Sequence, residues 1–412
     1  MREEKFLSLS STTLSEPQAS TLISAMAEYR ENVGGRFGVI EKLFKIAGIP
    51  VTSDEKSFLY SVYQVLVVTS GYLTLLTTFV GILKNLDDME YVMEVARPGF
   101  VMINLVWMHF FTSMNMNGVR SLLFMTKHFT WSELPTRDSQ TGSLTMAGWI
   151  QRIQPLVWRL NFCDWGTHFL YFVLRGVTSN GKPFFFDAWF PLDTEDPSSY
   201  ALALIIQALG SVMLGTTLFA VMGLYVALVS IGCTQLEKIQ AALMDINQQR
   251  LPEMQTSLVQ CVKHHQHVLR YMKELETTFS PVLFGPFLSV VAALCFTAYT
   301  AIRIGGKFVE IIQIFIITAA MMFQLQAVCW FGTELNKQSG RVRDAAFGSD
   351  WVGAPVAFQR SIRFIISVTK DFTLTAGKVI PVYQSTVMVV LNETYRFLMV
   401  LLNFVDKSSE VQ

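Results

Sequence analysis

Residues 200–236 read YALALIIQALGSVMLGTTLFAVMGLYVALVSIGCTQL and contain no charged side chain. A helix needs about 20 apolar residues to cross the hydrocarbon core of a bilayer, so this stretch predicts a membrane-spanning helix. Other charge-poor runs predict further helices of the same kind. In chain order, the predicted spans are Phe58–Leu83, Pro98–Gly118, Ile153–Leu174, Tyr200–Leu236, Thr278–Ile302, Ile311–Thr333 and Val379–Phe404.

The composition of the whole chain agrees with a membrane protein. Of its 412 residues, 51% are hydrophobic and 16% are charged, whereas soluble domains usually carry about 25% charged residues. The 32 basic and 32 acidic residues cancel, which gives no reason to expect a nucleic-acid partner. The expected surroundings are a lipid bilayer.

The orientation follows from the positions of lysine and arginine. These residues are concentrated in the N-terminal segment and in every second segment between the spans. The positive-inside rule therefore predicts a cytoplasmic N-terminus, and seven crossings place the C-terminus outside the cell. The predicted fold class is an all-α membrane protein with seven transmembrane helices. A G-protein-coupled receptor has the opposite orientation, and the inverted repeats typical of transporters are not seen.

Two inner segments and one outer loop are distinctive. Residues 237–277 and 334–378 show apolar residues at helical spacing, which predicts cytoplasmic helical extensions that form an anchor region. The outer loop at residues 179–200 mixes aromatic side chains, acids and prolines. It is expected to form a lid over a pocket that opens outward.

Three segments in the C-terminal third resemble the signature region of insect odorant receptors. They are residues 262–290, 329–351 and 374–402. The matching positions are His265, Gln266, Leu269, Phe279, Ser280 and Pro281; Phe331, Gly332, Glu334, Leu335, Ser339, Ala345, Ala346 and Trp351; and Leu374, Thr375, Ala376, Gly377, Lys378, Pro381, Tyr395 and Phe397. The first 150 residues resemble the family only in layout.

The resemblance implies a function. Members of the family form tetrameric, non-selective cation channels that an odorant opens directly, and each subunit gives one helix to a central pore. The chain resembles the odorant-tuning subunit, which joins a shared co-receptor in the plasma membrane of olfactory neurons, because the co-receptor's large insertion between the fourth and fifth helices is absent. The alternatives are a gustatory-type homomeric ligand-gated channel and, less favoured, a G-protein-coupled receptor. Motifs of enzymes are absent from the sequence, and no cofactor is expected.

The resemblance also divides the chain into regions. The predicted regions are a cytoplasmic segment at 1–57, helices one to four with an outer-half odorant pocket at 58–236, a cytoplasmic helical linker at 237–277, helices five and six at 278–333, a cytoplasmic anchor segment at 334–378, the pore helix at 379–404, and an extracellular tail at 405–412.

In this family the odorant pocket lies in the outer halves of the second, third, fourth and sixth spans. Aromatic and aliphatic walls with a few hydroxyls suit a small, mostly apolar volatile, because burial then provides most of the affinity. The candidate ligand-binding residues are Phe100, Asn104, Trp107, Thr167, Leu170, Tyr171, Leu204, Ala208, Val212, Ile314 and Thr318.

The last span carries a polar stripe. Helical spacing puts six residues on one face, namely Ser385, Val389, Asn392, Arg396, Met399 and Asn403. Polar groups in a membrane need water or a partner, so this face is predicted to line the conduction path; the alternative is packing between subunits through hydrogen bonds. The resemblance places a hydrophobic gate at Val400 and Phe404. Arg396 is expected to pair with Glu393 or to be tolerated because one subunit supplies it.

Two further groups of residues receive a structural interpretation. Arg159 and Asp164 lie inside the third span and are expected to satisfy polar groups on other helices. His264, His265 and His267 lack the cysteines or carboxylates that would complete a metal site, so no metal is predicted.

Overall fold

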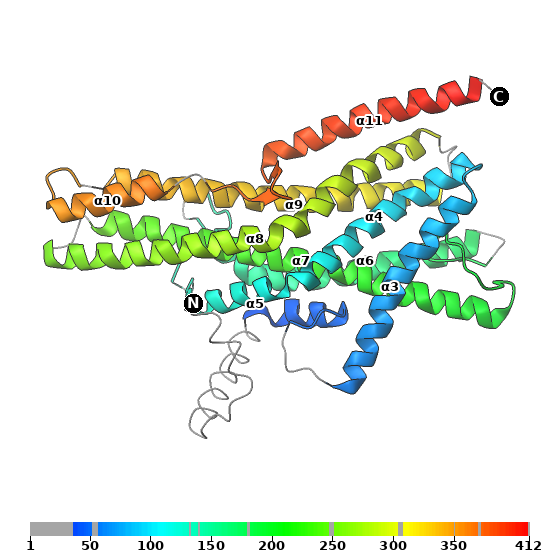
Figure 1. Ribbon diagram of the computed structural model, residues 1–412, viewed down its shortest axis with the longest axis horizontal. Coiled ribbons are helices and arrows are strands. Elements are labelled where there is room, and N and C mark those ends of the chain that lie inside the picture. The colour runs from blue at the N-terminus through cyan, green and yellow to red at the C-terminus, as the bar shows by residue number, and fades with distance from the viewer. Residues whose placement is uncertain are drawn as a thin grey trace.

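The computed structural model describes residues 36–51, 57–131, 133–138, 141–178, 182–246, 251–303, 308–349, 351–369 and 372–410. These residues are mostly helical, as the sequence predicts (Figure 1). Residues 36–46 form a first helix. The elements that follow are α3 (Phe58–Lys84), α4 (Met89–Met114), α5 (Met116–Met125), η2 (Thr126–His128), α6 (Met146–Thr178), α7 (Pro197–Asp245), α8 (Leu251–Arg303), α9 (Phe308–Phe347), α10 (Val356–Val368), β1 (Thr375–Ala376), β2 (Ile380–Pro381) and α11 (Gln384–Glu410).

Three helices are much longer than a bilayer is thick. α7, α8 and α9 contain 49, 53 and 40 residues. At a rise of 1.5 Å per residue, α8 is roughly 80 Å long, against a hydrocarbon core of about 30 Å. Their ends gather with α10 at one end of the elongated molecule (Figure 1). We call this part, formed by residues 237–245, 251–277, 334–347 and α10, the anchor end.

The helices account for the predicted spans with some changes of boundary. Among the described residues, α3, α7, α8, α9 and α11 are long and apolar enough to cross a membrane. α4 and α6 are less apolar but have 26 and 33 residues, which is a sufficient length. The second predicted span continues past the end of α4 into α5, and the seventh includes β2 before α11 begins. Hydropathy averages over such breaks because they are short: a single residue, Asn115, separates α4 from α5.

The larger of two hydrophobic clusters runs through the anchor end. Leu228, Tyr271, Leu275, Leu335 and Ile362 are completely buried in it. The Tyr271 hydroxyl donates to the carbonyl oxygen of Leu228 at 2.7 Å, which satisfies the polar atom that this aromatic side chain buries. A second, much smaller cluster lies where α3, α4 and α7 meet, and it consists of Val67, Met102, Leu105, Met213 and Leu214.

The chain reaches α11 through a short hairpin held by α8 and α9. β1 and β2 pair antiparallel, and Gly377 and Lys378 turn between them with positive φ angles of 61° and 60°. The Gly377 amide donates to the Ser280 carbonyl at 2.8 Å, and the Gln384 amide donates to Thr333 Oγ1 at 2.8 Å. The three segments that carry the sequence resemblance therefore meet at the start of α11.

Candidate ligand-binding cavity

The described part of the chain contains a cavity of about 190 Å³ between α4, α6, α7 and α9. These helices carry the second, third, fourth and sixth predicted spans. The walls are mostly aliphatic and aromatic, which suits a small apolar ligand. The polar residues in the lining are Asn104, Asp164, Thr167, His168, Tyr171, Ser211 and Gln324.

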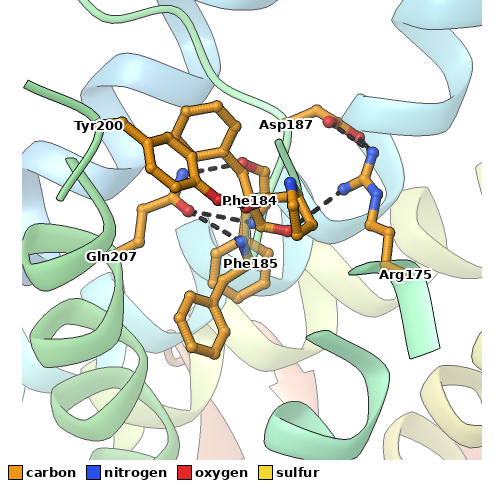
Figure 2. A network of polar contacts seen from close by, with 8 residues as sticks. Arg175, Phe184, Phe185, Asp187, Tyr200 and Gln207 are labelled. Atoms are coloured by element: carbon orange, nitrogen blue, oxygen red, sulfur yellow. Dashed lines mark hydrogen bonds and ion pairs between the residues drawn. The ribbon is translucent and has the colours of Figure 1, made fainter. Parts of the chain in front are cut away.

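The described residues of the loop between α6 and α7 lie at the cavity, and the side chain of Gln207 on α7 holds the loop backbone (Figure 2). The Gln207 side-chain oxygen accepts from the amides of Phe185 and Phe186 at 3.0 and 3.4 Å. Its amide nitrogen donates to the Phe186 carbonyl at 2.8 Å. Phe185 and Phe186 thereby line the cavity. Part of the loop thus forms cavity wall, and its role as a lid stays a prediction.

Further contacts fix the loop to three helices. Arg175 at the end of α6 contacts both carboxylate oxygens of Asp187 at 2.6 Å (Figure 2). Both side chains are about three-quarters buried, at 25% and 30% exposed. The Trp189 amide donates to the Thr77 carbonyl of α3 at 3.1 Å, and the Lys84 ammonium lies 3.5 Å from the centre of the Trp189 ring. The loop is thus held in place by contacts with three helices.

Four of the predicted ligand-binding residues line the cavity: Asn104, Thr167, Leu170 and Tyr171. Two others pack between α4 and α8 instead. Phe100 stacks on Phe296 with ring centres 5.2 Å apart, and Trp107 Nε1 donates to the Pro281 carbonyl at 2.9 Å. The remaining five lie outside the lining and are partly buried, namely Leu204, Ala208, Val212, Ile314 and Thr318.

On α7 the difference lies mainly along the helix. Leu204 and Ala208 precede the lining residues Ser211 and Gly215 by seven positions, which is nearly the same face at 3.6 residues per turn, but they lie nearer the start of the helix. On α9 the lining residues cover a broad face from Ile312 to Met321, and Ile314 and Thr318 lie just beyond its edge. The helical spacing is visible in the sequence, but only packing shows which part of each helix lines the cavity. Phe185, Phe186 and His168 also line the cavity, although they are not among the residues predicted from the sequence.

The predicted pore-lining face of α11 is directed away from the rest of the chain. α11 packs on α8 and α9 through Val387, Val390 and Thr394. The predicted pore residues are exposed, namely Ser385, Val389, Asn392, Arg396, Met399, Val400 and Asn403, whereas the side chain of Phe404 lies outside the described residues. Arg396 Nη1 lies 2.7 Å from Glu393 Oε1, as expected from their spacing.

The two charged residues of the third span and the three histidines of the linker differ in their surroundings. Arg159 is exposed on α6, while Asp164 on the same helix lines the cavity. His265 is buried, and burial lowers its pKa to about 4. His264 is partly buried and His267 is exposed. Within the described residues, no grouping of three His, Cys, Asp or Glu side chains is suited to hold a metal ion.

Comparison with known proteins identifies the family. Residues 88–395 match the family model described as 7tm Odorant receptor. The chain therefore belongs to this family, which confirms the family predicted from the sequence. Its fold class is that of an all-α membrane protein with seven helices, and the family is one of odorant receptors, not an enzyme family.

Individual relatives are distant in sequence. Odorant receptor 83a of Drosophila melanogaster is 20% identical over 251 residues, which are 46% of this chain and 54% of that protein. Putative odorant receptor 19b of the same species is 23% identical over 239 residues, which are 57% and 62% of the two chains. The match therefore spans about half to three-fifths of these relatives.

Solved structures with the same fold cover more of the chain. The structure of the insect olfactory receptor OR5 from Machilis hrabei in complex with eugenol has a TM-score of 0.72 at 16% identity and covers 92% of this chain and 99% of that one. The structure of the same receptor described without eugenol has a TM-score of 0.70. At this identity, the likeness establishes the fold.

Proposed function

We propose that the chain is the odorant-binding tuning subunit of a heteromeric, odorant-gated, non-selective cation channel in the plasma membrane. The observation that carries the proposal is the lidded cavity between α4, α6, α7 and α9. Its apolar walls would bind a small volatile mainly through burial of apolar surface. The olfactory receptor OR5 of similar fold, whose solved complex holds eugenol, supports a small organic ligand.

The exposed face of α11 supports a pore in an assembly. A single chain leaves polar and charged groups of this helix without contacts to α8 or α9. In a membrane such groups need water or protein partners. In a tetramer the face from Ser385 to Asn403 would surround a conduction path, with Val400 and Phe404 as the apolar constriction.

The fold offers a mechanical connection between cavity and pore. α9 is one helix that contributes Ile316 and Gln324 to the cavity and Thr333 to the hairpin before α11. A ligand that packs against α9 in the open state more tightly than in the closed state would shift the equilibrium toward opening. The Gln384 amide, held by Thr333 Oγ1, passes the displacement to α11.

The experiment is co-expression in oocytes with and without an insect odorant co-receptor, recording membrane current during application of small volatiles while G-protein signalling is blocked. We expect a non-selective cation current only in cells that express both chains. Current from this chain alone would replace the proposal with a homomeric, gustatory-type channel. A response abolished by the G-protein block would overturn the channel assignment.

Orientation gives an independent test. We propose a cytoplasmic N-terminus and an extracellular C-terminus, on the evidence of the lysine and arginine distribution. An epitope tag on the C-terminus should be labelled on intact cells, and one on the N-terminus only after permeabilisation. The reverse result would favour the G-protein-coupled alternative.

A further inference from the structure

Asp164 is an unusual group for an odorant cavity. It is the one carboxylate among the described residues that line the cavity, and no described lysine or arginine lines it. Its side chain is only 23% exposed, and Phe186, Leu214 and other apolar residues share the lining. A charged group removed from water is costly unless a partner offsets the charge. The Asp164 carboxylate therefore needs a partner that offsets its charge.

His168, one turn along α6, is a poor partner for this carboxylate. Its Nδ1 lies 3.0 Å from the carbonyl oxygen of Asp164 but 3.7 Å from carboxylate Oδ1. Nδ1 can donate one proton at most, and the shorter distance favours donation to the carbonyl. Among the described residues, the Asp164 carboxylate is left with the long contact to the imidazole.

The other polar groups of the cavity mostly have their donors engaged. The Thr167 and Ser211 hydroxyls donate to backbone carbonyls of their own helices at 2.8 and 2.7 Å. Asn104 Nδ2 donates to Gln324 Oε1 at 3.4 Å, whereas the buried Asn104 Oδ1 has no partner. Tyr171 adds a hydroxyl that can serve in either role. The open positions are therefore chiefly hydrogen-bond acceptors, on α6 and on α4.

We propose that the cavity selects a small volatile whose head group donates hydrogen bonds, and that a protonated primary amine is preferred over the alcohol of the same shape. The ammonium group would contact the Asp164 carboxylate, and the apolar chain would lie against the aliphatic walls. An alcohol offers one donor without charge, and an ether offers none. The inference rests on the proposed function only in that the cavity is the site at which a ligand opens the channel.

The test uses three probes of equal size: hexylamine, hexan-1-ol and methyl pentyl ether. Each is measured by current in co-expressing oocytes and by thermal stabilisation of the purified full chain. We expect the half-maximal concentration to rise from amine to alcohol to ether, with roughly a tenfold difference between amine and alcohol, because hydrogen bonds to charged groups are the stronger ones.

The matched variant is Asp164→Asn, which keeps the shape and one acceptor but removes the charge. It should abolish the advantage of the amine over the alcohol while leaving the advantage of the alcohol over the ether. Taking the ratio between variant and wild type cancels the different partitioning of the probes into lipid or detergent. Asp193→Asn, the same change at an exposed residue of the lid, should leave all the ratios unchanged.

An ether that is as potent as the amine on the wild-type chain would overturn the proposal, as would an unchanged amine-to-alcohol ratio in Asp164→Asn. Amine-selective stabilisation of the purified chain without any current would uphold the head-group inference and contradict the channel function. Currents evoked equally by all three probes would uphold the channel function and contradict the head-group inference.

Discussion

The two ends of the molecule are built differently. At the anchor end, apolar side chains from four helices belong to the larger cluster and the buried hydroxyl of Tyr271 has its acceptor, although His265 Nε2 is buried without a partner. The helices around the cavity carry the smaller cluster, and more of the buried polar atoms that lack hydrogen-bond partners lie on them, among them atoms of Asn104, Asn161, Trp165 and Thr216. Unsatisfied groups and empty space reduce local stability. One end is suited to hold the fold and the other to respond to a ligand.

Leu→Ala changes at matched positions test the difference in packing between the two ends most strongly. Leu335→Ala removes a completely buried side chain of the anchor end and should lower the free energy of unfolding by about 2–5 kcal/mol. Leu214→Ala on the cavity wall should cost less, since the side chain has neighbours on fewer sides. Thermal unfolding of the purified chains measures both. Equal losses would show that the two ends are equally well packed.

Gly332→Ala should test the coupling between ligand binding and pore opening separately from stability. A Cβ at this position would lie 2.5 Å from the Val382 carbonyl oxygen, so the hairpin before α11 must shift. Such overpacking costs about 1–3 kcal/mol. We expect reduced odorant-evoked current with surface expression retained. The control is Gly99→Ala in α4, where a Cβ meets no atom within 4 Å. Full current from the Gly332 variant would remove the hairpin from the coupling path.

The lid is expected to depend on its most buried ion pair. Asp187→Asn weakens the paired contact with Arg175, and we expect a loss of ligand affinity on the order of 1 kcal/mol, or severalfold in half-maximal concentration. Glu195→Gln alters an exposed pair, in which the Glu195 side chain is 90% exposed and lies 3.6 Å from Lys182. Such pairs contribute little. Dose–response curves that shift equally for both variants would contradict a specific role for Arg175.

A pH dependence of stability is expected at the anchor end. Burial, together with the nearby Glu334, raises the pKa of Glu237 from 4.5 to about 7, while Arg341 lowers it. Gln338 Nε2 donates to Glu237 Oε1 at 3.2 Å and to Glu334 Oε1 at 2.9 Å. Because the folded pKa is the higher one, stability is lost as the pH rises from about 4.5 through 7.

Glu237→Gln removes that loss. The variant should match wild type near pH 4 and unfold at a higher temperature near pH 8, because a rise of the pKa from 4.5 to about 7 corresponds to a penalty on the order of 3 kcal/mol. Melting curves across this range provide the measurement. Glu133→Gln, at an exposed residue that pairs with Lys238 at 2.9 Å, serves as a control because its side chain is 67% exposed. An unchanged pH profile in Glu237→Gln would assign the dependence to another group.

The sequence predicts the helices well, but it predicts poorly which residues of each helix line the cavity. Long apolar runs such as residues 200–236 can hardly form anything but a spanning helix, and α7 includes all of it. Pocket residues depend on which face of a helix points inward and on how far along the helix the cavity extends. On α7, Leu204 and Ala208 share the face of Ser211 and Gly215 but precede the stretch that lines the cavity, whereas Val212 is turned by about 100° from Ser211.

Contacts between residues far apart in the chain could not be predicted from the sequence either. The aromatic and acidic composition of the loop predicts a cover over a pocket, yet nothing local indicates that Gln207 of the next helix holds its backbone. Likewise, the charge of Asp164 suggests a structural partner on another helix, and only the fold places it in the cavity wall. Helical spacing did predict the pair of Glu393 and Arg396, since both belong to one helix.

The attachment of the lid has a consequence for how receptors of this construction can diversify. Gln207 binds the peptide groups of Phe185 and Phe186 and makes no demand on their side chains. Mutations at these two positions can therefore change the shape and chemistry of the cavity wall while the backbone hydrogen bonds to Gln207 remain, although a change at Phe185 also removes its stacking on Phe172 of α6. After a gene duplication, ligand preference could therefore change through these two side chains while the hydrogen bonds between Gln207 and the loop backbone are retained.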